Sequence, residues 1–214
     1  PKIEALFDSI MQGYPINSFM FWEINSPNVK NSFKFYEFLK SYRAFFAEDN
    51  PDIDTKGFDD FIAVIDGQQR LKGTYAYKMP RKWWKNDEES LPTRRLYLNI
   101  SAPLPEENER MMKFDFEFLT EFEVEDMKDD PNYIWYKVND ILSFKDENDL
   151  DDFIDKQPWK ENRFAKSTIR TLYSRVYKDL LINYYLEESQ DIDTVLDIFI
   201  RTNSGGEPLS FSNL

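Results

Sequence analysis

One stretch of the sequence predicts a junction between a strand and a helix: Phe61-Ile62-Ala63-Val64-Ile65-Asp66-Gly67-Gln68-Gln69-Arg70. Its first five residues are an apolar run with the length and composition of a buried strand. Asp66 and Gly67 then form a common turn pair, and the residues from about Gln68 to Tyr77 are compatible with a helix. Backbone N–H groups at a helix start carry partial positive charge and bind anions. The stretch therefore predicts a strand, a turn and a helix start at which an anion can be held.

Two interpretations of residues 66–70 are open at this point. A junction of strand, turn and helix needs no ligand, because Asp-Gly is among the commonest turn pairs. The polar residues favour a site: Arg70 can form a bidentate contact with phosphate, and Gln68 and Gln69 can contact phosphate oxygens, a sugar, a base or an attacking water. Asp66 can hold a divalent ion or orient that water. The chain has no Walker motif.

The composition indicates a packed globular protein and excludes several kinds of chemistry. Of the 214 residues, 41% are hydrophobic and 17% are aromatic, which suffices for a substantial core. The absence of cysteine and histidine excludes disulfides, Cys/His zinc sites, thiol nucleophiles and Ser-His-Asp mechanisms. The net charge of -13 repels a phosphate backbone at long range. Because no segment resembles a signal peptide or an apolar span of about 18 residues, we expect a cytoplasmic protein without membrane contact.

The remaining patterns alternate between helical and strand periodicity, which predicts an α+β fold. Helices are expected where apolar residues recur every three or four positions, at residues 2–12, 35–46, 162–178 and 194–202, the last capped by Asp193. Strands are expected at residues 18–24, 95–100, 114–119 and 180–186, with the middle two paired as an antiparallel ribbon.

A second stretch combines a helix end with polar residues: Phe199-Ile200-Arg201-Thr202-Asn203-Ser204-Gly205-Gly206-Glu207-Pro208-Leu209-Ser210. Its simplest interpretation is a helix that ends at a glycine pair, followed by a loop. The functional interpretation adds Arg201 and Asn203 as phosphate or base contacts beside the glycines. Neither stretch decides between its interpretations alone.

Three motifs occur together in a fixed order. They are Asp8-Ser9-Ile10 with Gly13-Tyr14-Pro15-Ile16, then Val64-Ile65-Asp66-Gly67-Gln68-Gln69-Arg70-Leu71, then Phe199-x-Arg201-x-Asn203-Ser204-Gly205-Gly206-x-Pro208-Leu209-Ser210. In this order they resemble the N-terminal domain of GmrSD-type modification-dependent restriction systems. The resemblance covers nearly the whole chain.

The resemblance implies a fold, a ligand and a set of site residues. The expected fold is a ParB/sulfiredoxin-like mixed sheet with surrounding helices, forming a single domain over residues 1–214 that is truncated at both ends and has a variable insertion near residues 78–160. Such a domain binds a nucleoside triphosphate with Mg²⁺ and, in several members, hydrolyses it. The implied catalytic residues are Asp66, Gln68, Gln69 and Arg70, with Asp66 also the metal ligand. The implied nucleotide-binding residues are Gly67, Arg70, Arg201 and Asn203.

The resemblance also implies partners. A nuclease domain or subunit outside this chain is expected, together with DNA contact through the full-length protein, and an oligomer is compatible with the family. The leading hypothesis is therefore a nucleotide-binding regulatory domain, with NTPase activity, of a restriction or anti-phage defence protein.

Two other hypotheses come from the residues themselves. A non-catalytic module that binds protein or DNA is favoured by Arg81-Lys82-Trp83-Trp84-Lys85, although two core tryptophans flanked by exposed cations explain this cluster too. Catalysis by carboxylates alone would need residues 146–155 to hold a metal. Their spacing lacks the glycine of a calcium loop and is typical of a helix cap with a solvated face.

Overall fold

The computed structural model describes residues 2–36, 52–55, 57–68, 77–78 and 94–204. Contacts divide these residues into two compact units. Unit 1 contains residues 2–16, 77–78 and 94–182, and unit 2 contains residues 17–36, 52–55, 57–68 and 183–204. Each unit is therefore assembled from segments that are far apart in the sequence.

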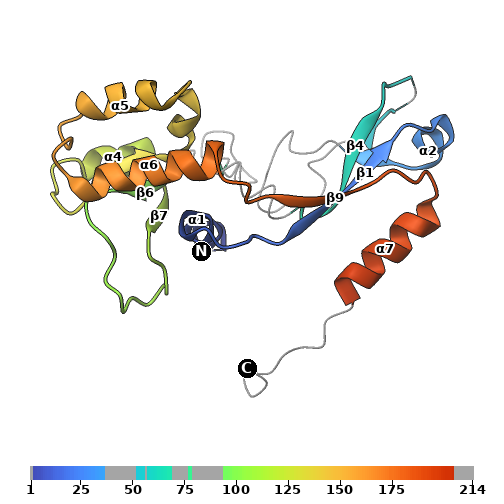
Figure 1. Ribbon diagram of the computed structural model, residues 1–214, viewed down its shortest axis with the longest axis horizontal. Helices are drawn as coiled ribbons and strands as arrows, with labels where there is room; N and C mark the ends of the chain where they lie inside the picture. Colours follow the sequence, from blue (N-terminus) through green and yellow to red (C-terminus); the bar gives the residue numbers. More distant parts are fainter. Residues whose placement is uncertain (1, 37–51, 56, 69–76, 79–93, 205–214) are drawn as a thin grey trace, which may run out of the picture. The chain divides into compact units, whose positions relative to one another are not determined.

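Unit 2 is built on a three-stranded sheet whose strands lie side by side in the order β4-β1-β9 (Figure 1). The central strand β1 (Ser18–Ile24) is antiparallel to β4 (Phe61–Asp66) and parallel to β9 (Asn183–Glu187). The other elements of the unit are α2 (Pro27–Ser32), the paired short strands β2 (Phe35–Tyr36) and β3 (Asp52–Ile53), and α7 (Ile192–Ser204).

The core of unit 2 lies on one face of this sheet. Alternate residues of β1 point to the same side, so Met20, Trp22 and Ile24 form a buried cluster with Val29 of α2 and Val195 of α7. Each fully buried side chain of this size stabilises the fold by about 1.5–3 kcal/mol. The amphipathic helix α7 is therefore held to the same face as these three residues of β1.

Unit 1 contains a four-stranded sheet, and β6 (Arg94–Asn99) pairs with each of the other three strands. The strands β5 (Tyr77–Lys78), β7 (Asp115–Leu119) and β8 (Trp135–Lys137) all pair with β6 in antiparallel fashion. The helices of the unit are α1 (Lys2–Gln12), α4 (Glu121–Asp126), the 3-10 helix η1 (Val138–Ser143), α5 (Glu147–Asp155) and α6 (Arg163–Tyr177).

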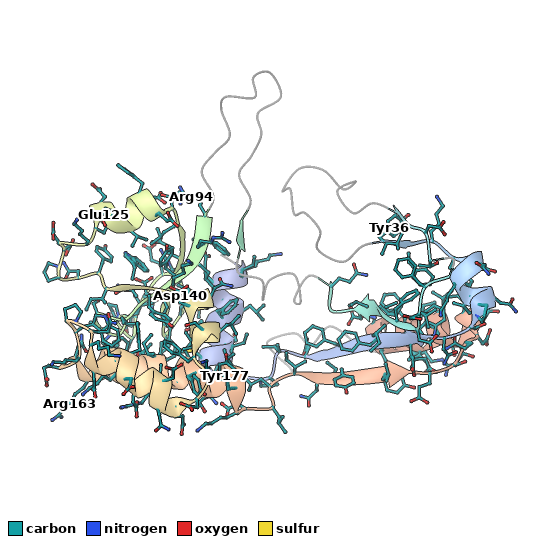
Figure 2. All side chains as sticks on the ribbon, turned by 90° about the horizontal axis from the view of Figure 1, so that it is seen from above. Tyr36, Arg94, Glu125, Asp140, Arg163 and Tyr177 are labelled. Atoms are coloured by element: carbon teal, nitrogen blue, oxygen red, sulfur yellow. The ribbon has the colours of Figure 1, made fainter. Side chains whose placement is uncertain are left out.

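Side-chain caps determine where several of these helices begin. Thr120 and Glu123 form a capping box at the start of α4, and Arg94, labelled in Figure 2, makes two hydrogen bonds of 2.8 Å to the Glu123 carboxylate. Partial burial alone would raise the pKa of Glu123, but hydrogen bonds from Thr120 and Arg94 outweigh it and lower that pKa. Asn162 caps α6 by accepting from Ala165 N at 3.0 Å.

Asp8 joins α1 to the segment that precedes β7. Its buried carboxylate accepts hydrogen bonds from Lys113 N at 2.9 Å, Phe114 N at 2.8 Å and the Gln12 side chain at 2.7 Å. All three contacts satisfy a charge that burial would otherwise penalise. The Asp8 carboxylate thus has a structural task within unit 1.

The α+β fold class is confirmed, and several elements match the sequence-based expectation. Helix α1 and strand β1 have the expected bounds, α6 differs by one residue at each end, and β6 and β7 pair as the expected antiparallel ribbon. Asp146 caps α5 by accepting from Asp149 N, as the interpretation of residues 146–155 predicted. The single domain over residues 1–214 and its ParB/sulfiredoxin-like topology stay predictions.

Four expectations need correction. Phe35 and Tyr36 form a strand with residues 52–53 instead of starting a helix, and the rest of that expected helix lies outside the described residues. Tyr77 belongs to β5 and not to a helix end. Strand β9 begins at Asn183 because its partner β1 begins at Ser18, so residues 180–182 have no strand partner there. Asp191, not Asp193, caps α7 by accepting from Thr194 N. In the described part of the chain no helix is long and apolar enough to span a membrane.

Candidate functional site

A β-bulge at the end of β4 sets the direction of Asp66. The β1–β4 register is regular up to the pair of Phe21 and Val64. The next residue of β1, Met20, then faces Asp66, so Ile65 is an extra residue without a partner. Without the bulge, Asp66 would face Phe19 on the opposite side of the sheet. The bulge therefore turns Asp66, which is half-buried, to the face that carries Met20 and the core of unit 2.

Gly67 is the one residue type that fits directly after the bulge. Its φ of +87° lies in the left-handed region that L side chains rarely adopt. A Cβ atom at this position would stand 2.3 Å from Cδ1 of Phe19, which is itself almost fully buried. Both the backbone conformation and the approach to the ring thus require glycine between Asp66 and the helical residue Gln68.

Gln68 begins the helical backbone that follows the turn. Its side-chain Nε2 donates to Val64 O at 3.0 Å, so the exposed amide is held back against the end of β4. The predicted strand and turn are therefore confirmed, and Gln68 has a helical backbone, but residues 69–76 of the expected helix lie outside the described residues. Gln69 and Arg70 lie outside the described residues, as does the cluster of residues 81–85.

The second motif lies at the end of α7. Arg201 Nε pairs with Asp197 Oδ2 at 2.9 Å, and their side chains are 78% and 59% exposed, so this pair faces solvent. Asn203 Nδ2 donates to Phe199 O at 2.9 Å, which makes the amide part of the last helical turn. Gly205, Gly206 and the residues after them lie outside the described residues.

Apolar residues next to each of the two motifs pack against the same hydrophobic core, that of unit 2. Ile65, directly before Asp66, packs against the core of unit 2. Ile198 and Phe199, which precede Arg201 by three and two positions, pack against the same core. The structure thus places both motifs at one face of the sheet, but the charged groups of Arg201 and Asp66 make no described contact with each other.

Two residues that sequence patterns did not single out share this face. Met20 faces Asp66 on one side and Tyr185 on the other, so the three residues form a row across the sheet. Two strand spacings place the backbones of Asp66 and Tyr185 about 10 Å apart. Tyr185 Oη donates to Glu187 Oε2 at 2.7 Å, and Glu187 is buried. This hydrogen bond raises the pKa of Tyr185. Tyr185 and Glu187 are two positions apart at the end of a predicted strand, so the sequence could have placed both on one face of the sheet.

The donor set beside Gly67 fits a Mg²⁺-bound phosphate. Magnesium usually takes one or two carboxylates together with phosphate oxygens and water, so Asp66 alone can serve as its protein ligand. The backbone N–H of Gln68, directly after the glycine turn, is a donor that a phosphate can use. Among the described residues no group of three or more acidic side chains gathers as a metal site.

The family model of the GmrSD restriction endonuclease, N-terminal domain, matches residues 1–214. The chain belongs to this family. A comparison with curated proteins gives no match.

Membership in the GmrSD family confirms the resemblance drawn from the three motifs and assigns the chain to a restriction and defence protein. Within this GmrSD N-terminal domain, Asp66, Gly67 and Gln68 lie together at the end of β4, and Arg201 and Asn203 lie at the end of α7. Asp8 of the first motif accepts hydrogen bonds within unit 1 and belongs to neither group. The catalytic and binding roles expected for Asp66, Gly67, Gln68, Gln69, Arg70, Arg201 and Asn203 stay predictions.

Proposed function

We propose that this GmrSD N-terminal domain binds a Mg²⁺–nucleoside triphosphate at the end of β4, hydrolyses it, and thereby regulates the nuclease domain of the full protein. The bulge at Ile65 is the observation that carries the proposal. It places a carboxylate, a glycine turn and a helix start together on the face of the sheet that α7 covers. A plain strand-to-helix turn would need no such bulge.

Each described residue has a separate task in this proposal. Asp66 holds the metal and orients an attacking water, and the backbone at Gln68 receives the terminal phosphate. The side chain of Gln68 reaches a phosphate oxygen after releasing Val64 O. The metal supplies the charge that neutralises the phosphate oxygens. Gln69 and Arg70 take the phosphate-contacting roles that the family resemblance gives them.

Two residues of α7 would complete the pocket. Arg201 is paired with the exposed carboxylate of Asp197, so exchanging Asp197 for a phosphate costs little free energy. Asn203 can contact sugar or base near the end of the helix. Tyr185 lies across the sheet from Asp66 on the same face, at a separation that suits the nucleoside end of the ligand. A nucleotide would thus extend from Asp66 toward Tyr185.

A binding assay with a matched pair of carboxyl variants tests the proposal. ATP, GTP, CTP and UTP are titrated with Mg²⁺ into the chain by calorimetry, and thermal unfolding is measured in parallel. A ligand at one hundred times its Kd stabilises the folded state by about 2.7 kcal/mol. Asp66→Asn should weaken binding about tenfold, because a charge-assisted contact is lost. Glu188→Gln removes an exposed carboxylate of the same unit and should leave the affinity unchanged.

Turnover is measured as phosphate release by the same proteins. Loss of release in Asp66→Asn and Arg70→Ala, with normal release in Glu188→Gln, is the expected result. Binding without release would favour the non-catalytic module, which uses the nucleotide as a signal only. Failure of all four nucleotides to bind the full-length protein would contradict the proposal.

A further inference from the structure

Unit 1 contains a cavity whose walls are largely aromatic. The cavity has a volume of about 280 Å³, near the lower end of the range for ligand pockets. Five aromatic side chains line it: Tyr97, Trp135, Tyr136, Phe153 and Trp159. They come from β6, β8, α5 and the turn after α5. All of these residues belong to unit 1, and none belongs to the three motifs discussed above.

The aromatic walls are fixed by ring contacts. Phe153 packs edge-on against Tyr136 at 6.3 Å and against Trp159 at 6.2 Å between ring centroids. Trp135 stacks on Tyr133 at 5.6 Å with an interplanar angle of 10°. Rings that are held in place in this way offer a preformed surface for a flat ligand.

Unpaired polar atoms gather in the same wall. In the part of the chain that the structure describes, three buried side-chain atoms have no hydrogen-bond partner: Trp135 Nε1, Tyr136 Oη and Asn139 Oδ1. Water does not reach these atoms, and an unpaired buried polar group costs free energy. Trp135 and Tyr136 both line the cavity, so a ligand that shifts their rings slightly can pair the two donors.

The remaining polar lining residues supply both a donor and acceptors. Lys137 Nζ lies 3.5 Å from Asp140 Oδ1, and both residues line the cavity. Asp140 is labelled in Figure 2. Gln157 also lines it, and its Nε2 donates to Phe153 O at 3.3 Å. The hydroxyls of Tyr97 and Tyr136 are protonated at neutral pH, as tyrosine hydroxyls ordinarily are, and burial raises the pKa of each further.

We propose that this cavity binds a nucleobase, as a free nucleoside or as an unstacked base of a single strand. Aromatic walls stack on the faces of a heterocycle, and its edge carries the acceptors and donors that Trp135, Tyr136, Lys137 and Asp140 can pair. The cavity is too small for a larger cofactor. The proposal concerns unit 1 alone and does not rest on the triphosphate site of unit 2.

The charges around the cavity distinguish this ligand from two others. A quaternary ammonium ion also favours aromatic walls, but it has no acceptor for the unpaired donors and is repelled by Lys137. A phosphate group is opposed by Asp140 and by the net charge of -13. The base should therefore bind more tightly as a nucleoside than as a nucleoside monophosphate, which is the reverse of the preference expected at Asp66.

The test is a calorimetric titration of the whole chain with adenosine, guanosine, cytidine and thymidine, their 5′-monophosphates and a short single-stranded oligonucleotide. At least one nucleoside should bind, and its monophosphate should bind more weakly. Tyr136→Phe and Trp135→Phe each keep an aromatic ring but remove one unpaired donor. Each should weaken the nucleoside about tenfold, because one hydrogen bond is lost. Tyr136→Phe should leave the melting temperature unchanged or raise it.

Two control variants separate binding from folding. Trp22→Phe in unit 2 removes an indole N–H that is already bonded, to Ser189 O at 2.6 Å. It should lower the melting temperature and leave nucleoside affinity unchanged. Glu188→Gln, which removes an exposed carboxylate of unit 2, should also leave it unchanged. Oligonucleotide binding that is lost in Tyr136→Phe would support the proposal with a nucleic-acid strand as the source. Absence of nucleoside and oligonucleotide binding at millimolar concentration, or binding unaffected by Tyr136→Phe, would overturn it, as would binding of choline or a hexose instead.

Discussion

At the scale of single residues, Gly67 and Gly57 share a positive φ, as Gly13 also does, but have different surroundings. Gly67 has φ +87° and lies against Phe19, whereas Gly57 has φ +77° and nothing within 4 Å of its missing Cβ. Gly67→Ala adds an overpacked contact to the conformational penalty, and we expect the free energy of unfolding to fall by about 3 kcal/mol. Gly57→Ala carries only the conformational part, about 1 kcal/mol. Urea unfolding of both variants measures the difference, and equal losses would contradict the close approach of Phe19.

Tyr136 allows a second residue-scale prediction, in alkaline solution. Burial, with the nearby charges of Asp140 and Tyr177, raises the pKa of the Tyr136 hydroxyl above the ordinary value of 10.0. Above that pH the unfolded chain loses this proton and the folded chain keeps it, so stability falls as pH rises. Full stability is retained below pH 10. One such group contributes a slope of about 1.4 kcal/mol per pH unit. Urea unfolding between pH 9 and 11 should show a shallower fall for Tyr136→Phe than for the parent chain, and parallel curves would exclude this cause.

At the scale of elements, Asp8 connects helix α1 to the segment that precedes strand β7. Its carboxylate accepts from two consecutive backbone N–H groups, at Lys113 and Phe114. Asp8→Ala removes the acceptor from both part-buried donors and leaves a gap beside them, and we expect a loss of about 2 kcal/mol in the free energy of unfolding. Asp8→Asn keeps one oxygen acceptor without the charge and should lose about half as much. Nucleotide affinity at unit 2 should not change in either variant once the protein is folded, and a selective loss of affinity would instead give Asp8 a role in binding.

Elements with strong local patterns were predictable, and those that depend on distant partners were not. Residues 2–12 carry a regular helical pattern and residues 18–24 a dense aromatic run, and both elements formed where these features placed them. Phe35 also fitted a helical spacing, but pairing with Ile53 and an edge-on contact of 5.0 Å with Phe61 hold it in a strand. The polar turn at residues 66–68 was predictable from its composition. The bulge that turns Asp66 depends on the register with β1, and Tyr185 joins that face only through parallel pairing, so neither could be predicted from local sequence.

At the scale of the whole molecule, the two units divide the chain unequally. All described residues of unit 1 lie before residue 183, whereas unit 2 takes β9 and α7 from residues 183–204. A chain that ends at residue 182 lacks Val195 and the partner strand of β1, so unit 2 should lose its core. The core of unit 1, which includes Leu98 and Phe116, stays complete.

Hydrogen exchange of this shortened chain gives the corresponding measurement. Backbone amides of β6 and β7 should keep their protection, and those of β1 and β4 should exchange quickly. Exchange of all four strands at the same high rate would show that residues 1–214 unfold as the single domain that the family resemblance predicts.

The parallel pairing of β1 with β9 also affects the order of events at the ribosome. Ser18 is made long before its partner Asn183, so the central strand of unit 2 waits on the order of ten seconds for its neighbour during translation. Unit 1 has all its described residues before that moment. The face that holds Asp66 is therefore completed after unit 1, and the proposed nucleotide site cannot form before β9 has been made.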